Sequence, residues 1–182
     1  MTGLNTILAI AANRLPAVGI DCILIGGFAV NHYGYTRNTL DVDFMIFSDQ
    51  LDLLKQIMQE EGFTNVSIQE NVAFFNKPDS PLRVDFLRAD TATMQKLLRN
   101  AVTINMHGYT IKVPSLKDLI AMKIFAFANA PARRLGKDLP DITFLITLHE
   151  LDMEADIRPL CNQFGTRQTY DLINEQVKAL RS

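Results

Sequence analysis

The chain has 182 residues, of which 48% are hydrophobic, and this length suits one domain with a sizeable core or a domain with a helical appendage. The formal net charge of −2 excludes a global attraction to nucleic acid or anionic membranes, so a polyanion would have to be held locally. Cys22 and Cys161 lack a CxxC spacing, which leaves little support for a disulfide framework or a zinc site. The apolar runs are far shorter than a membrane span and the first residues do not resemble a signal peptide, so we expect a cytoplasmic protein.

The first part of the chain alternates between helix-like and strand-like patterns. In chain order the predicted elements are a helix at 4–14, a strand at 22–25, a helix at 28–33, a strand at 40–47, a helix from Ser48 as N-cap to about 61, strands at 64–69, 72–76 and 82–87, a helix at 91–99, and a hairpin of strands 102–105 and 110–113.

The pattern changes near Pro114 and is then almost wholly helical. Helices are predicted near 116–129, 138–150 and 153–180, and the last should break near Gly165. This order predicts the α+β class, with a mixed β-sheet flanked by helices and followed by a helical C-terminal part. We expect an α/β core at 1–113 and a helical subdomain at 114–182 that packs on it.

Two aspartates interrupt the apolar strand predicted at 40–47. Because side chains alternate along a strand, Asp41 and Asp43 share one face while Val42 and Phe44 share the other. One face therefore belongs to the core, and the other meets water or a ligand. An exposed strand edge with solvated acids is the simplest alternative.

The strand predicted at 82–87 shows the same alternation of apolar and acidic residues. Val84 and Phe86 share a face, and Asp85 projects from the opposite one. If the two strands are neighbours, three repelling carboxylates converge, and a positive charge is needed to neutralise them. Oxygen ligands without His or Cys favour Mg²⁺ or Mn²⁺. A salt bridge from Asp85 to Arg83 or Arg88 is the alternative.

A glycine pair precedes the first acidic strand. Gly26 and Gly27 follow a buried strand and precede a predicted helix, where a phosphate can approach backbone N–H groups. A glycine pair by itself more often makes a turn. Its position fourteen residues before Asp41 leaves room for one short helix and a return turn, so both features can face one cleft.

The segment IGGFAVNHYGYTRNTLDVDFMIF resembles the signature of the DNA polymerase β type nucleotidyltransferase superfamily. The match includes the glycines, Arg37, Thr39, both acids and the apolar flanks, and Asp85 in RVDFL corresponds to the third carboxylate. PSLKDLIAMK and RRLGKDLPDITFL are similar to helical segments of the bacterial AbiEii/AbiGii toxin branch. Together these segments cover roughly residues 22–148.

The resemblance implies transfer of a nucleoside monophosphate from a nucleoside triphosphate to an acceptor hydroxyl, with release of pyrophosphate. Asp41, Asp43 and Asp85 would be the catalytic and metal-binding residues, for Mg²⁺ or Mn²⁺. Gly26, Gly27, Arg37 and Thr39 would bind the nucleotide, although Arg37 also suits a structural role in the loop. Gly27 stands where many members have serine, so one phosphate-binding hydroxyl is absent.

Two lysines of the C-terminal part are further candidates for the nucleotide site. Lys123 falls within the apolar stripe of the helix predicted at 116–129, so it needs either a triphosphate or an internal carboxylate as partner. Lys137 belongs to the basic cluster before Asp138 and Asp141, which helix-terminus electrostatics also explains. The family comparison places this segment near the nucleotide.

Other classes of protein agree less well with the sequence. A glycosyltransferase needs a larger nucleotide-binding domain, and a dehalogenase-type phosphatase needs a threonine where Phe44 and Met45 stand. Neither GxGxxG nor a P-loop occurs. The main alternative is a catalytically degenerate module of the same fold that binds nucleotide or protein. The acceptor, whether tRNA, protein or small molecule, and an antitoxin partner stay open.

Overall fold

The structure is a computed structural model that describes residues 3–78 and 80–182. Its internal contacts divide the chain into two compact units. Unit 1 comprises Met1–Ala29 and Arg37–Ser115, and unit 2 comprises Val30–Thr36 and Leu116–Ser182. Helix α3 (Gly26–His32) therefore begins in unit 1 and ends in unit 2. The segment Val30–Thr36 of the N-terminal half also belongs to unit 2. The change of pattern near Pro114 did not predict this.

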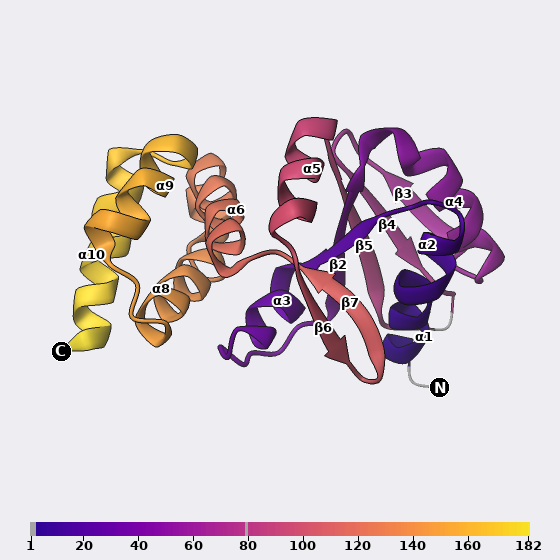
Figure 1. The fold of residues 1–182 in the computed structure, drawn as a ribbon, viewed down its shortest axis with the longest axis horizontal. Helices are drawn as coiled ribbons and strands as arrows, with labels where there is room; N and C mark the ends of the chain where they lie inside the picture. The colour runs from indigo at the N-terminus through magenta and orange to yellow at the C-terminus, as the bar shows by residue number, and fades with distance from the viewer. Residues whose placement is uncertain (1–2, 79) are drawn as a thin grey trace. The chain divides into compact units, whose positions relative to one another are not determined.

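Unit 1 is built on a five-stranded mixed sheet (Figure 1). Its strands are β1 (Cys22–Ile25), β2 (Asp41–Phe47), β3 (Asn65–Ile68), β4 (Val72–Asn76) and β5 (Arg83–Ala89), in the spatial order β1-β2-β5-β4-β3. Strands β2 and β5 are parallel, and every other pair of neighbours is antiparallel. The predicted α+β fold with a mixed sheet is confirmed.

One face of this sheet carries the core of unit 1. The inward side chains of β2 and β5, such as Phe44 and Phe86, are buried, and their rings stack with centroids 5.4 Å apart. Helices α1 (Gly3–Ala9), η1 (Ile10–Arg14), α2 (Leu15–Ala17) and α4 (Leu51–Glu60) contribute the apolar residues that pack against them. The alternation of the strands thus leaves the acidic positions on the opposite face.

A separate hairpin and one more helix complete unit 1. Strands β6 (Val102–Met106) and β7 (Tyr109–Val113) turn at His107 and Gly108, which both have positive φ, as a two-residue hairpin of this twist requires. Ile111 and Val113 of β7 join the core cluster. Helix α5 (Thr91–Asn100) begins at Asp90, whose side chain accepts from the backbone N–H of Thr93 at 2.9 Å.

The predicted capping role of Ser48 is wrong. Ser48 opens a short 3₁₀ turn, η2 (Ser48–Gln50), and α4 begins only at Leu51. The hydroxyl of Ser48 instead donates to the carbonyl of Ala89 at 2.7 Å, across to the end of β5. As an N-cap, Ser48 would accept from a backbone N–H of its own helix, but its hydroxyl instead donates to a carbonyl that is distant in the sequence.

Unit 2 consists mainly of helices. They are α6 (Leu116–Asn129), α7 (Pro131–Arg134), α8 (Asp138–Leu148), the π-helical turn η3 (Met153–Ile157), α9 (Arg158–Phe164) and α10 (Arg167–Arg181). Helix α6 packs against α8 and α9, and α10 packs against α8 (Figure 1). The break predicted near Gly165 is confirmed, because α9 ends at Phe164 and α10 starts at Arg167. Across residues 3–78 and 80–182, every helix is too short or too polar to cross a bilayer.

Candidate active site

The acidic side chains of β2 and β5 meet on one face of the sheet. These strands pair in parallel with Asp41 opposite Arg83 and Asp43 opposite Asp85. Residues in register on neighbouring strands project to the same side, so Asp41, Asp43 and Asp85 share the face away from the core. Asp85 is buried with 5% exposure, although no apolar partner can satisfy a carboxylate.

Arg83 supplies the charge that these carboxylates require. Its Nε donates to Asp85 Oδ1 at 2.7 Å, and its Nη2 donates to Asp85 Oδ2 at 2.8 Å. The same Nη2 also donates to Asp41 Oδ2 at 2.9 Å, so one guanidinium joins both strands. The pKa of Arg83 is raised, first by its hydrogen bond to Asp85 and then by the charges of Asp85, Asp41 and Asp43.

Strand β4, which pairs with β5, contributes an aromatic contact to the Arg83 guanidinium. Phe74 on β4 lies opposite Asp85, and its ring centroid is 5.0 Å from Arg83 Cζ. A guanidinium within about 6 Å of an aromatic face is attracted to it. Arg83 is therefore fixed by two carboxylates and one ring while 40% of its side chain stays exposed.

Gly26 lies directly against Asp43. It has φ +64°, and a Cβ at this position would lie 2.0 Å from Asp43 Oδ2. Both the backbone angle and the carboxylate exclude a side chain here. Gly26 was predicted to let a phosphate approach, and that contact stays a prediction. The structure gives a different reason for glycine here, because the Asp43 carboxylate lies against it.

Gly27 lies against two other predicted residues. A Cβ here would lie 2.7 Å from Thr39 Oγ1 and 3.2 Å from Arg37 Nη1. The hydroxyl of Thr39 also donates to the backbone carbonyl of Asp41 at 3.1 Å. The space that a serine side chain would enter is thus filled by Thr39 and Arg37. This packing is a physical reason for glycine at this position.

A second group of charges forms in unit 2. The ammonium of Lys123 lies 3.0 Å from Asp138 Oδ1 and 2.6 Å from Asp141 Oδ2. Arg134 Nη1 adds a contact of 3.2 Å to Asp138 Oδ2. Two cations and two anions balance in a site where Lys123 and both aspartates are buried. Of the two partners predicted for Lys123, the internal carboxylate is the one observed.

The predicted residues thus fall into two groups. Unit 1 brings together the three acids and their neighbours, namely Gly26, Gly27, Arg37, Thr39, Asp41, Asp43 and Asp85. Lys123 and the exposed Lys137 belong to unit 2. Nucleotide contacts of both lysines stay predictions.

The fit of this face to a divalent cation can be judged from its donor atoms. Three carboxylates on one face of the sheet, two of them (Asp43 and Asp85) in register, offer the oxygen ligands that Mg²⁺ prefers. Arg83 already stands as a cation between Asp41 and Asp85, which shows that the face accepts positive charge. In the part of the chain that the structure describes, no group of three or more acidic, His or Cys side chains is already arranged to hold a metal ion. The donors therefore fit such an ion in kind, with Arg83 as the present counter-charge.

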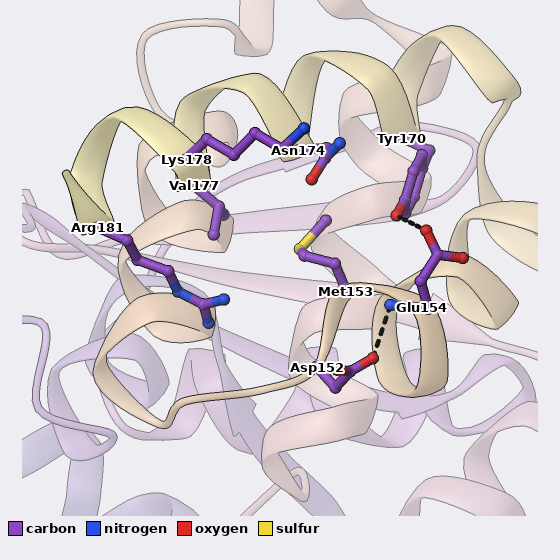
Figure 2. A pocket seen from close by; sticks show the side chains of 8 residues that line it. All are labelled: Asp152, Met153, Glu154, Tyr170, Asn174, Val177, Lys178 and Arg181. Carbon is purple, nitrogen blue, oxygen red and sulfur yellow. Dashed lines mark hydrogen bonds between the residues drawn. The ribbon is translucent and has the colours of Figure 1, made fainter.

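Unit 2 also contains a hollow of about 340 Å³ along α10 (Figure 2). It is lined by Asp152, Met153, Glu154, Tyr170, Asn174, Val177, Lys178 and Arg181. Tyr170 donates its hydroxyl to Glu154 at 2.8 Å, and Arg181 donates to the backbone carbonyls of Ile146 and Leu151. Tyr170, Glu154 and Arg181 thus serve the local structure, and the predicted site residues do not line this hollow.

Comparison with known proteins decides the family. The model of the family described as "Nucleotidyl transferase AbiEii toxin, Type IV TA system" matches residues 9–182. The chain belongs to the AbiEii nucleotidyl transferase toxin family. This membership confirms the predicted resemblance to the AbiEii branch. A search of curated proteins gave no match.

Solved structures with the same fold agree with the AbiEii assignment. An antigenic nucleotidyltransferase-like protein from Paracoccidioides brasiliensis has 21% identity and a TM-score of 0.60, covering 97% of this chain and 92% of its own. The antibiotic-resistance factor ANT(2'')-Ia has 14% identity and a TM-score of 0.57, with coverage of 100% and 93%. The lincosamide adenylyltransferase LnuA has 12% identity and a TM-score of 0.55, with coverage of 78% and 94%. At these identities the likeness concerns the fold.

Sequence reasoning missed part of the site of this AbiEii family member. It considered Arg83 as a partner of Asp85 but gave no sign of its bond to Asp41 or its contact with Phe74. The Arg-x-Asp spacing on a strand was the available signal, because residues two apart share a face. The contact to Asp41 depends on strand pairing over 42 residues, which a local pattern does not contain.

Proposed function

We propose that this AbiEii family member is a divalent-cation-dependent nucleotidyltransferase that moves a nucleoside monophosphate from a nucleoside triphosphate to an acceptor hydroxyl. The observation that carries the proposal is the register of β2 and β5, which sets Asp43 opposite Asp85 beside Asp41. These three carboxylates do not contribute to packing, and their mutual repulsion destabilises the folded state. Binding of a cation would be a reason to keep them. The family match supports the class of reaction.

The residues of unit 1 divide the work of this reaction. Asp41 and Asp43 would hold the cation, and Asp85 would help to hold it and orient the acceptor hydroxyl. The acceptor oxygen attacks the α-phosphorus, its proton passes to Asp85, and the bond from the α-phosphorus to the leaving pyrophosphate oxygen breaks. A bound Mg²⁺ or Mn²⁺ supplies the charge that stabilises the attacking and leaving oxygens.

The nucleotide is expected on the glycine side of the acidic face. Gly26 and Gly27 carry no side chain, so their backbone can lie close to phosphate oxygens. Arg37 and Thr39 adjoin Gly27 and offer donors of the kind that bind a triphosphate. We include Lys123 and Lys137 as proposed nucleotide contacts, and for Lys123 such a contact would compete with Asp138 and Asp141.

Several acceptors are compatible with this chemistry. Proteins of like fold include an adenylyltransferase of lincosamide antibiotics and a CCA-adding enzyme complexed with CTP. A small-molecule hydroxyl, a tRNA end and a protein hydroxyl are therefore the acceptors to test. The family description names a toxin–antitoxin system, which motivates a test for an antitoxin partner. We also propose that the reaction takes place in the cytoplasm.

One observation favours a second function. Arg83 holds both oxygens of Asp85 and one oxygen of Asp41, so these two acids have a cationic partner without a divalent cation. A module with this arrangement could bind nucleotide or a protein without turnover. The retention of all three acids argues for the enzyme, because a binding module does not need three repelling carboxylates.

The test is transfer of label to a panel of acceptors. The chain is incubated with each α-labelled nucleoside triphosphate, Mg²⁺, and tRNA, protein or aminoglycoside acceptors, and the products are separated. Asp43→Ala and Asp85→Ala are each expected to lower transfer by about a thousandfold, because charge stabilisation is the main catalytic contribution here. Asp49→Ala, an exposed acid at the end of β2, is the control. Nucleotide binding without transfer to any acceptor would favour the binding module.

A further inference from the structure

Arg83 occupies the atoms that a divalent cation needs. Its guanidinium takes both oxygens of Asp85 and one oxygen of Asp41, at distances from 2.7 to 2.9 Å. A metal ion bound to the same oxygens would lie within a few ångströms of the guanidinium, where two positive charges repel. Arg83 and the cation therefore compete for the same two carboxylates.

The side chains of Arg83 and Asp85 differ in their freedom to move. The Asp85 side chain is 7% exposed, so its burial fixes it in the sheet. The Arg83 side chain is 40% exposed and is a long flexible stem. The guanidinium can swing into water, where it is well solvated, while the carboxylate cannot follow it.

The ring of Phe74 explains why Arg83 holds this position in the absence of metal. It lies 5.0 Å from Arg83 Cζ and next to Asp85 in register, so it supports the guanidinium over the acidic face. Phe74 is partly buried on β4, which makes it a fixed platform.

We propose that Arg83 is a positioning residue that serves as the resident counter-ion of Asp41 and Asp85 and gives way when a divalent cation binds. The inference rests on the proposed function, since it assumes that the cation uses these acids. Two consequences follow. The apo protein avoids carboxylate repulsion, and its affinity for the cation is lower than the three acids alone would give.

The test measures Mn²⁺ affinity by electron paramagnetic resonance of free Mn²⁺ in the purified full chain. Arg83→Met removes the competing charge but keeps an unbranched side chain over Phe74, so Mn²⁺ is expected to bind about tenfold more tightly than in the wild type. Phe74→Leu weakens the platform and should tighten Mn²⁺ binding about two- to threefold. Arg88→Met is the matched control, because Arg88 lies on the same strand but donates to the backbone of Ser48 and Glu70.

A thermal readout separates this role from simple support of the fold. Without metal, Arg83→Met should melt below the wild type, because the acids repel one another. Mn²⁺ should then raise its melting temperature more than it raises that of the wild type. A purely structural arginine predicts a loss that Mn²⁺ does not restore.

The outcomes distinguish this inference from the proposed function. Equal or weaker Mn²⁺ binding in Arg83→Met, with binding in the wild type that Asp43→Ala abolishes, overturns the role of Arg83 and leaves the metal site standing. If neither the folded wild type nor Arg83→Met binds Mn²⁺, the metal site and this inference both fail. Tighter binding in Arg83→Met and in Phe74→Leu, with Arg88→Met unchanged, supports the proposal.

Discussion

The two units each contain a cation held by two aspartates, and the two clusters differ mainly in burial. In the sheet cluster of unit 1 (Asp41, Asp43, Arg83 and Asp85), the cation is 40% exposed. In the helix cluster of unit 2 (Lys123, Arg134, Asp138 and Asp141), the ammonium side chain is 7% exposed.

This difference separates a cation that can be exchanged from one that is part of the fold. A buried ion that loses its partner cannot be rescued by water, whereas a partly exposed one can. The charges of the helix cluster balance as two against two, so it needs no further ion. The sheet cluster brings three carboxylates to one face of the sheet, and its guanidinium is partly exposed. The sheet cluster is therefore the one for which we propose a divalent cation.

The largest expected effect is the loss of the buried ammonium. Lys123→Met leaves Asp138 and Asp141 without their shared partner and should lower the free energy of unfolding by about 3–5 kcal/mol. Urea denaturation measures it, and Lys117→Met, at an exposed position of the same helix, should change stability by less than about 0.5 kcal/mol. A loss no larger than that of the control would remove the distinction between the two clusters.

The next largest loss of stability is expected for a substitution at Gly26, next to the sheet cluster. Gly26→Ala combines a positive φ with a Cβ that meets the Asp43 carboxylate, so we expect a loss of about 2–3 kcal/mol. Gly19→Ala is the matched control, because Gly19 has φ +80° but nothing within 4 Å of the added Cβ, and it should cost about 1 kcal/mol. Equal losses in thermal denaturation would show that Asp43 moves aside freely.

A smaller loss of stability is expected for a substitution at the next residue, Gly27. Gly27→Ser introduces the serine typical of the superfamily that the sequence resembles, but its Cβ would meet Thr39, so the free energy of unfolding should fall by about 1–2 kcal/mol. Gly136→Ser, which enters open space, should leave the melting temperature nearly unchanged. If Gly27→Ser leaves the stability unchanged, Thr39 and Arg37 move aside easily, and packing is not the reason for glycine at this position.

The smallest effect concerns the exposed ion pair itself. A double-mutant cycle of Arg83→Met and Asp41→Asn should give a coupling of about 0.5–1 kcal/mol, because both side chains are about a third exposed or more. The corresponding cycle of Lys123→Met and Asp141→Asn should give a clearly larger coupling. Equal couplings from chemical denaturation would contradict the comparison of the clusters.

Much of the sheet cluster could be predicted from local periodicity. The alternation in β2 put Asp41 and Asp43 on one face, and the same alternation in β5 put Asp85 on its outer face. The glycine pair indicated a position where side chains are excluded, and in the structure Gly26 lies against Asp43 and Gly27 against Thr39. These features depend on a few consecutive residues, so a sequence carries them directly.

Partners distant along the chain could not be predicted in the same way. Ser48 was expected to cap a helix but bonds to Ala89, and Lys123 had two possible partners until the packing of α6 on α8 placed Asp138 and Asp141 beside it. In each case more than one partner was chemically possible. Burial and distance decide among them, and neither is a local property.

The sequence by itself determined the elements, the faces of the strands and the family of this protein, because backbone geometry fixes which residues share a face. The tertiary structure alone decided that β2 lies beside β5, and therefore that Arg83 joins Asp41 to Asp85. The physical reason is that a carboxylate takes whichever cation desolvation and packing bring within hydrogen-bond distance, and these depend on the whole fold.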